Sequence, residues 1–301
     1  MNQSNDRFRW EHVGRHVPDS TGGVSNAFEV VVHTSLLDGA VAATKVVVVS
    51  MLLSVSLSPA IALGFLVALA VYGSNKLVDD EDEVNCPERA AFVSRHRTLL
   101  TVMTVGSYLF ALGIAALEGP LSFGLVSVPG LAAVLYSVEW VPYDDGTRLK
   151  DVLFVNTALV AAAWAIPLTF LPITYADRSP GLASFTIFGF FFLQTVVAGE
   201  VMNARDVVGD RREGVSTLST RLGVERTRRV LLTLDFLTAA LLGLAAWSGV
   251  LAAEQVLALT PALLFSLAVT SLVGRDRDLS QLAAARDAEY PIMFLGVLVL
   301  L

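Results

Sequence analysis

The chain has 301 residues, of which 54% are hydrophobic and only 16% are charged. A soluble globular protein carries about a quarter charged residues, so the composition argues against that class. The formal net charge of −7 argues against a nucleic-acid partner, and the single cysteine, Cys86, excludes an intramolecular disulfide. The four histidines show no metal-ligand spacing.

The apolar residues gather in runs of about 20, the length that crosses a bilayer as a helix. The runs are continuous and rich in Leu, Ala and Val, and they lack the alternation of a barrel strand. We therefore predict an all-α, polytopic membrane protein with about nine transmembrane helices around a central cavity.

In chain order, residues 1–25 are polar and lack the apolar core of a signal peptide, so we expect a flexible cytoplasmic N-terminus. A single transmembrane domain is expected over residues 26–301. Its apolar segments fall at about residues 28–57, 59–73, 99–117, 121–136, 152–171, 182–202, 230–247, 251–273 and 291–301. The last segment would rise only about 16 Å as a helix, so it is either extended backwards through 283–285 or truncated.

Basic residues predict the orientation of the chain. Almost all of the 21 lysines and arginines lie in the N-terminal segment or in the loops after segments two, four, six and eight. The loops on the opposite side hold only Arg178. Because basic loops stay in the cytoplasm, we expect a multi-pass cell-membrane protein whose N-terminus and four large loops are cytoplasmic.

The stretch from Asn203 to Gly223 follows the sixth apolar segment and carries a carboxylate pair, Asp206 and Asp210. Positions four apart lie on one helix face, where two carboxylates repel unless a cation neutralises them. Oxygen ligands without thiol or imidazole select Mg²⁺ or a similar hard ion. A solvated face of acids and arginines is the plainer alternative for such a run.

An earlier stretch of the same form follows the second segment and contains Asn75, Asp79 and Glu83, with Asp82 competing for the last position. Two similar halves that face one cavity would bring the two acidic stretches together, as membrane proteins often build their central sites. Two facing carboxylate pairs suggest a diphosphate held between Mg²⁺ ions, with its hydrocarbon tail inside the bundle.

The stretch D-V-V-G-D-R-R-E-G-V-S-T-L-S-T-R-L-G, residues 206–223, resembles the second motif of the UbiA-type intramembrane prenyltransferases. The family's first motif, N-x-x-x-D-x-x-x-D, is matched by Asn75, Asp79 and Glu83, with Glu where Asp is usual. The resemblance implies a nine-helix fold with cytoplasmic loops. It also implies Mg²⁺-dependent transfer of a prenyl group from an allylic prenyl diphosphate to an aromatic or lipid acceptor, in lipid, quinone or carotenoid-type biosynthesis.

The resemblance further implies roles for individual residues. The metal ligands would be Asp79, Glu83, Asp206 and Asp210, and Lys150 would meet the diphosphate and complete the catalytic set. The expected substrate contacts are Asn75, Asn203, Arg89, Arg221 and Tyr136.

One departure from the family concerns the acceptor. The Arg-Pro pair of the first helix in many members is replaced here by residues 33–38, H-T-S-L-L-D, so no particular acceptor is predicted. Two other classes remain open, a non-catalytic relative with a degraded site and a cation-binding membrane transporter. The acids and their neighbouring arginines lie on one side only, which fits a bound phosphate better than a translocation path.

Overall fold

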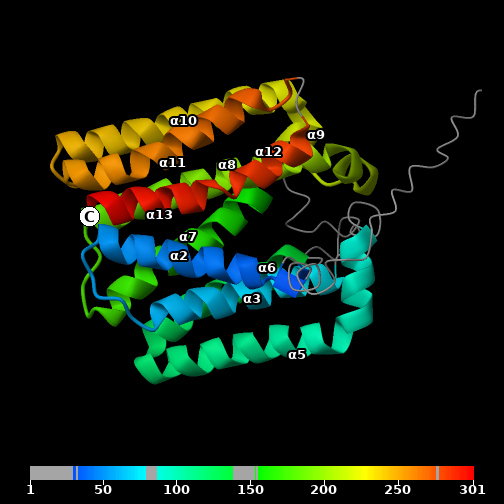
Figure 1. The fold of residues 1–301 in the computed structure, drawn as a ribbon, viewed down its shortest axis with the longest axis horizontal. Helices are drawn as coiled ribbons and strands as arrows, with labels where there is room; N and C mark the ends of the chain where they lie inside the picture. Colours follow the sequence, from blue (N-terminus) through cyan, green and yellow to red (C-terminus); the bar gives the residue numbers. More distant parts are fainter. Residues whose placement is uncertain (1–29, 32, 79–86, 138–152, 154, 276–277) are drawn as a thin grey trace, which may run out of the picture.

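The computed structural model describes residues 30–31, 33–78, 87–137, 153, 155–275 and 278–301. These residues form a bundle of roughly aligned helices (Figure 1). In chain order the helices are α2 (Leu36–Leu52), α3 (Ala60–Val78), α5 (Pro87–Glu118), α6 (Pro120–Ser137), α7 (Val155–Tyr175), α8 (Leu182–Glu213), α9 (Leu218–Leu222), α10 (Val224–Trp247), α11 (Ala253–Leu272), α12 (Leu279–Arg286) and α13 (Glu289–Leu300).

Six of these helices are long and apolar enough to cross a membrane within the part of the chain that the structure describes: α3, α5, α7, α8, α10 and α11. Large apolar side chains such as Leu117 and Trp247 are 90% and 86% exposed, as expected for surfaces that face lipid. The predicted all-α membrane class is therefore confirmed, whereas the count of nine membrane helices is not.

Three stretches of the chain differ from the expected segments. Helix α5 begins at Pro87 and bends at His96 (φ −111°, ψ 18°), so a stretch expected as loop forms a helical arm across one end of the bundle (Figure 1). Helix α8 continues past the apolar run as far as Glu213. The last segment is neither one extended helix nor a lone short one, because α12 and α13 are separate helices that meet at Asp287 and Ala288.

Two apolar clusters make up most of the core. One joins α8, α10, α11 and α13 and includes Phe190 and Leu259, and the other joins α3, α5 and α6 and includes Leu63 and Val126. Helices α2 and α7 contribute side chains to both clusters. They lie at the middle of the bundle and form the seam between its two parts (Figure 1).

A chain of buried polar contacts crosses the second part of the bundle. Arg286, 1% exposed, pairs with Glu289 at 2.6 Å, and its other terminal nitrogen donates to Gln194 Oε1 at 2.9 Å. Gln194 Nε2 donates in turn to Asp235 Oδ1 at 3.2 Å, and the Ser266 hydroxyl donates to the same oxygen at 2.6 Å. These contacts connect α8, α10 and α11 to the break between α12 and α13.

Replacing Arg286 by Met should lower the free energy of unfolding by about 3 kcal/mol, because it leaves the Glu289 carboxylate buried without its partner. The measurement is thermal unfolding of the purified protein in detergent. Arg229→Met is the control, since Arg229 pairs with Glu225 on a surface where both side chains are well exposed, 72% and 64%. Such a pair contributes less than about 1 kcal/mol, so equal effects of the two substitutions would contradict this reading of the buried pair.

Candidate active site

The C-terminal continuation of α8, beyond its apolar run, positions the second acidic stretch. Asn203, Asp206 and Asp210 lie on one continuous helix at spacings of three and four, so they share a face. Asp206 receives two hydrogen bonds from the neighbouring Arg205 guanidinium, at 2.8 and 2.6 Å, and both side chains are partly exposed. Asp210 is more buried, with 8% of its surface exposed.

The turn that follows α8 brings the chain back to Asp210. Gly214 has φ +77°, and the Val215 N–H donates to the Asp210 carbonyl at 2.9 Å. Thr217 begins α9, where its hydroxyl accepts from the Thr220 N–H at 3.2 Å. The same hydroxyl donates to Asp210 Oδ2 at 3.4 Å. The Thr217 hydroxyl also lies 3.3 Å from Thr220 Oγ1, so its single proton is shared between two acceptors, one of which is a carboxylate of the predicted pair.

Arg221, predicted to contact substrate, lies on α9 and donates to the Ser216 hydroxyl from two of its nitrogens, at 3.2 and 2.9 Å. These bonds keep the guanidinium against the loop that follows Asp210. The guanidinium that contacts the carboxylate pair directly is that of Arg205, on Asp206, whereas Arg221 lies on the loop that follows Asp210.

The first acidic stretch is only partly described. Asn75 lies exposed in the last turn of α3, and Asp79, Asp82 and Glu83 lie outside the described residues. The neighbouring Lys76 pairs with Asp38 on α2 at 3.1 Å. The C-terminal ends of α3 and α8 lie at the same end of the bundle, on the right of Figure 1, as the prediction of two facing acidic stretches requires.

Of the remaining predicted residues, the structure describes some and not others. Arg89 lies half-buried in the first turns of α5, Tyr136 belongs to the end of α6, and Lys150 lies outside the described residues. Among the residues that the structure describes, no three Asp, Glu, His or Cys side chains are close enough to hold a metal ion. Asp206 and Asp210 supply hard oxygen donors that suit Mg²⁺, and the other two predicted ligands fall in the part not described.

Glu200 is a polar residue of this region that the sequence interpretation did not include. It is 1% exposed within the apolar part of α8. It accepts hydrogen bonds from the Thr157 hydroxyl on α7 at 2.6 Å and from the Leu218 N–H on α9 at 3.3 Å. The sequence alone could have identified Glu200, because a carboxylate within a membrane segment is expected to have a specific partner or role.

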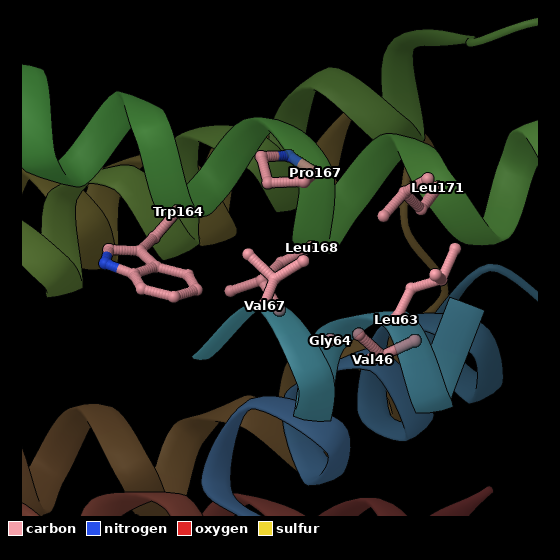
Figure 2. Close-up of a pocket in the computed structure, with 8 residues that line it drawn as sticks. All are labelled: Val46, Leu63, Gly64, Val67, Trp164, Pro167, Leu168 and Leu171. Atoms are coloured by element: carbon pink, nitrogen blue, oxygen red, sulfur yellow. The ribbon is translucent and has the colours of Figure 1, made fainter. Parts of the chain in front are cut away.

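The interior behind the acidic end is tightly packed along the seam. Between α2, α3 and α7 there is a void of about 10 Å³, bordered by Val46, Leu63 and Trp164 (Figure 2). The Trp164 ring also stacks on Tyr72, with centroids 5.2 Å apart and planes 5° from parallel. A void of this volume holds about one water molecule.

A larger hollow lies between α3, α5 and α6. Its volume is about 260 Å³ and its lining is almost wholly apolar. The lining residues are Ala70, Val71, Ser74, Thr104, Val105, Tyr108, Leu109, Gly130, Ala133 and Val134. Ser74 lies one residue before Asn75, so one end of this hollow is close to the first acidic stretch.

The fold is that of a multi-pass membrane protein, and α8 carries two carboxylates, Asp206 and Asp210, beyond its apolar run. The comparisons identify its family. A family model described as "UbiA prenyltransferase family" matches residues 33–298. The chain belongs to the UbiA prenyltransferase family, which confirms the resemblance seen in the sequence.

Relatives and solved structures agree with this family. A digeranylgeranylglyceryl phosphate synthase of Methanoregula boonei is 29% identical over 169 residues, which cover 54% of this chain and 56% of that protein. A UbiA homologue from Aeropyrum pernix shares the fold with a TM-score of 0.68 at 12% identity, over 88% of this chain and 98% of that one.

A second solved homologue, from Archaeoglobus fulgidus, was bound to DMAPP and Mg²⁺. It aligns with a TM-score of 0.59 at 14% identity, over 90% of this chain and 99% of that one. At these low identities the two structures support the fold and carry no residue assignment.

Gly214 gives a test of the turn beside Asp210. Gly214→Ala should destabilise the protein by about 1 kcal/mol, because an L residue is strained at φ +77° although its Cβ would meet no atom within 4 Å. Gly113→Ala is the matched control, because Gly113 lies inside α5 and its added Cβ also meets nothing within 4 Å. There Ala should be neutral or stabilising. Equal unfolding temperatures of the two variants would contradict the strained-turn assignment.

Proposed function

We propose that this protein transfers a prenyl group from an allylic prenyl diphosphate to a lipophilic acceptor, with Mg²⁺ as the required cofactor. The observation that carries the proposal is the pair Asp206 and Asp210 at the end of the apolar helix α8, with the Arg205 guanidinium on Asp206, in a chain of the UbiA family. Polar groups at one end of an apolar bundle suit a substrate with a charged head and a hydrocarbon tail.

The metal would be bound by Asp206 and Asp210 from α8 and by Asp79 and Glu83 from the first acidic stretch. When bound, Mg²⁺ neutralises the charge that develops on the departing diphosphate. Arg221 and Lys150 share that charge in the proposal, and Asn75, Asn203, Arg89 and Tyr136 contact the substrate.

The chemistry then needs an apolar, water-poor space. The bond between the allylic carbon and the diphosphate oxygen breaks, with its electron pair leaving on the diphosphate. A new bond forms from the acceptor to the allylic carbon, and the acceptor loses a proton. The apolar side chains around the site keep water from capturing the allylic cation.

Two relatives support the choice of substrates. The Archaeoglobus fulgidus homologue was solved with DMAPP, a short allylic diphosphate, and Mg²⁺. The Methanoregula boonei relative is named as a synthase of digeranylgeranylglyceryl phosphate, a lipid product. We therefore propose a lipid or aromatic acceptor within the membrane, and a cytoplasmic location for the N-terminus and the acidic end.

Asp206→Asn and Asp210→Asn should each lower the rate of prenyl transfer by about 10²- to 10³-fold, because each removes a charge that holds the metal against the diphosphate. The measurement is incorporation of labelled prenyl diphosphate into extracted lipid by purified protein in liposomes, with Mg²⁺ or with a chelator.

Asp177→Asn is the control for these variants. Asp177 is exposed in the connection after α7, and its φ of +52° is a conformation that Asn also adopts. It should keep full activity. Normal activity in both α8 variants would remove the metal assignment, and absence of any Mg²⁺-dependent labelling would favour a non-catalytic relative.

The hollow between α3, α5 and α6 is proposed to hold part of the prenyl chain, since it is apolar and begins near Asn75. Ala133→Phe would fill part of it. We expect a several-fold higher KM for a C20 donor and an unchanged KM for a C5 donor. Ala116→Phe, an exposed position on α5 outside the hollow, is the control. An equal effect on both donor lengths would contradict this use of the hollow.

A further inference from the structure

Glu200 links three segments of the chain from inside the bundle. Its carboxylate lies on α8 and accepts from Thr157 of α7 at 2.6 Å and from the backbone N–H of Leu218 at 3.3 Å. Burying a carboxylate costs several kcal/mol unless hydrogen bonds compensate, and at 1% exposure Glu200 has these two donors together with the Asn203 side chain of its own helix. The position of Leu218 is therefore coupled to that of Glu200.

The segment fixed in this way is the one that touches Asp210. Leu218 follows Thr217 directly, and the Thr217 hydroxyl donates to Asp210 Oδ2 at 3.4 Å. Ten residues of α8, about 15 Å of helix, separate Glu200 from Asp210. The loop of residues 214–217 spans that distance. It leaves α8 at Gly214, and the residue that follows it, Leu218, is hydrogen-bonded to Glu200.

We propose that Glu200 is a positioning residue for the metal-binding carboxylate of Asp210. By holding Leu218 it fixes Thr217, and Thr217 fixes the direction in which the Asp210 oxygens point. The proposal rests on the proposed function in one respect, that Asp210 binds the metal. Residues that hold metal ligands through hydrogen bonds change metal affinity by about 10- to 100-fold when they are lost.

A purely structural role makes a different prediction. Helices α7 and α8 approach closely at this level, where a Cβ on Gly199 would lie 3.2 Å from Thr157 Cγ2. If Glu200 only joined these helices, its loss would lower stability and leave the metal affinity of the folded protein unchanged. Metal affinity therefore separates the two roles.

The experiment measures Mn²⁺ binding to the purified full-length protein in detergent by electron paramagnetic resonance, together with the unfolding temperature. Glu200→Gln should weaken Mn²⁺ binding by about tenfold, because an amide has one oxygen where the carboxylate has two. Thr157→Val should act in the same direction. Thr157→Ser keeps the hydroxyl and should bind Mn²⁺ like the unmodified protein.

Asp235→Asn is the matched control. Asp235 is another fully buried carboxylate with two side-chain donors, and these come from Gln194 and Ser266, away from the loop. This variant should unfold at a lower temperature and keep its Mn²⁺ affinity. An unchanged affinity in Glu200→Gln, or a change no larger than that in Asp235→Asn, would overturn the proposal. If Glu200→Gln does not fold, the Thr157 variants decide instead. The proposal is then overturned if Thr157→Val binds Mn²⁺ as tightly as Thr157→Ser, or loses no more affinity than Asp235→Asn.

Failure of the proposed function gives a different pattern. If the unmodified protein binds Mn²⁺, loses it in Asp210→Asn and transfers no prenyl group, prenyl transfer is excluded and the role of Glu200 is still decided by its own variant. If Asp210→Asn binds Mn²⁺ normally, Asp210 is not a ligand, and the positioning role is overturned.

Discussion

The buried contact between Arg286 and Gln194 ties together helices that apolar packing alone would leave free to slide. In lipid, side chains gain little by leaving one apolar surroundings for another, so interhelical hydrogen bonds and close packing determine how helices align. Arg286 bonds to α8 through Gln194 and to the start of α13 through Glu289. The break between α12 and α13 is consequently held at a fixed height beside α8.

This anchoring affects the site because α8 is one continuous helix. Gln194, which Arg286 contacts, and the carboxylates Asp206 and Asp210 belong to the same 32-residue element. A helix is stiff along its axis, so fixing its middle at Gln194 also fixes how far its polar end projects. The seam helices α2 and α7 then hold this second part of the bundle against the first, whose helix α3 ends in the other acidic stretch.

The sequence predicted the features that depend on local patterns and missed those that depend on distant partners. Apolar runs located the long helices, and the spacing of Asp206 and Asp210 predicted that the two carboxylates share a helix face. The same runs ended α8 too early, because hydropathy marks where a helix leaves the apolar layer and not where its hydrogen bonds stop. The hydrogen-bond partners of Glu200 and Arg221 could not be predicted from the sequence, because they depend on how the chain turns back after Gly214.

Two buried carboxylates of this protein show how partners decide what such a group does. Asp235 receives donors from side chains on α8 and α11, so it joins helix to helix. Glu200 receives donors from Thr157 on a neighbouring helix, from Asn203 on its own helix and from the backbone N–H of Leu218 at the start of α9, so it joins α7 and α8 to the segment that follows the loop. Backbone groups in a turn have few alternative partners inside the bundle, and losing this acceptor would leave the Leu218 N–H unsatisfied in a buried position. The loop beside Asp210 therefore has a strong reason to remain where Glu200 holds it, and a metal site that includes Asp210 would gain its preorganisation from the interior of the bundle.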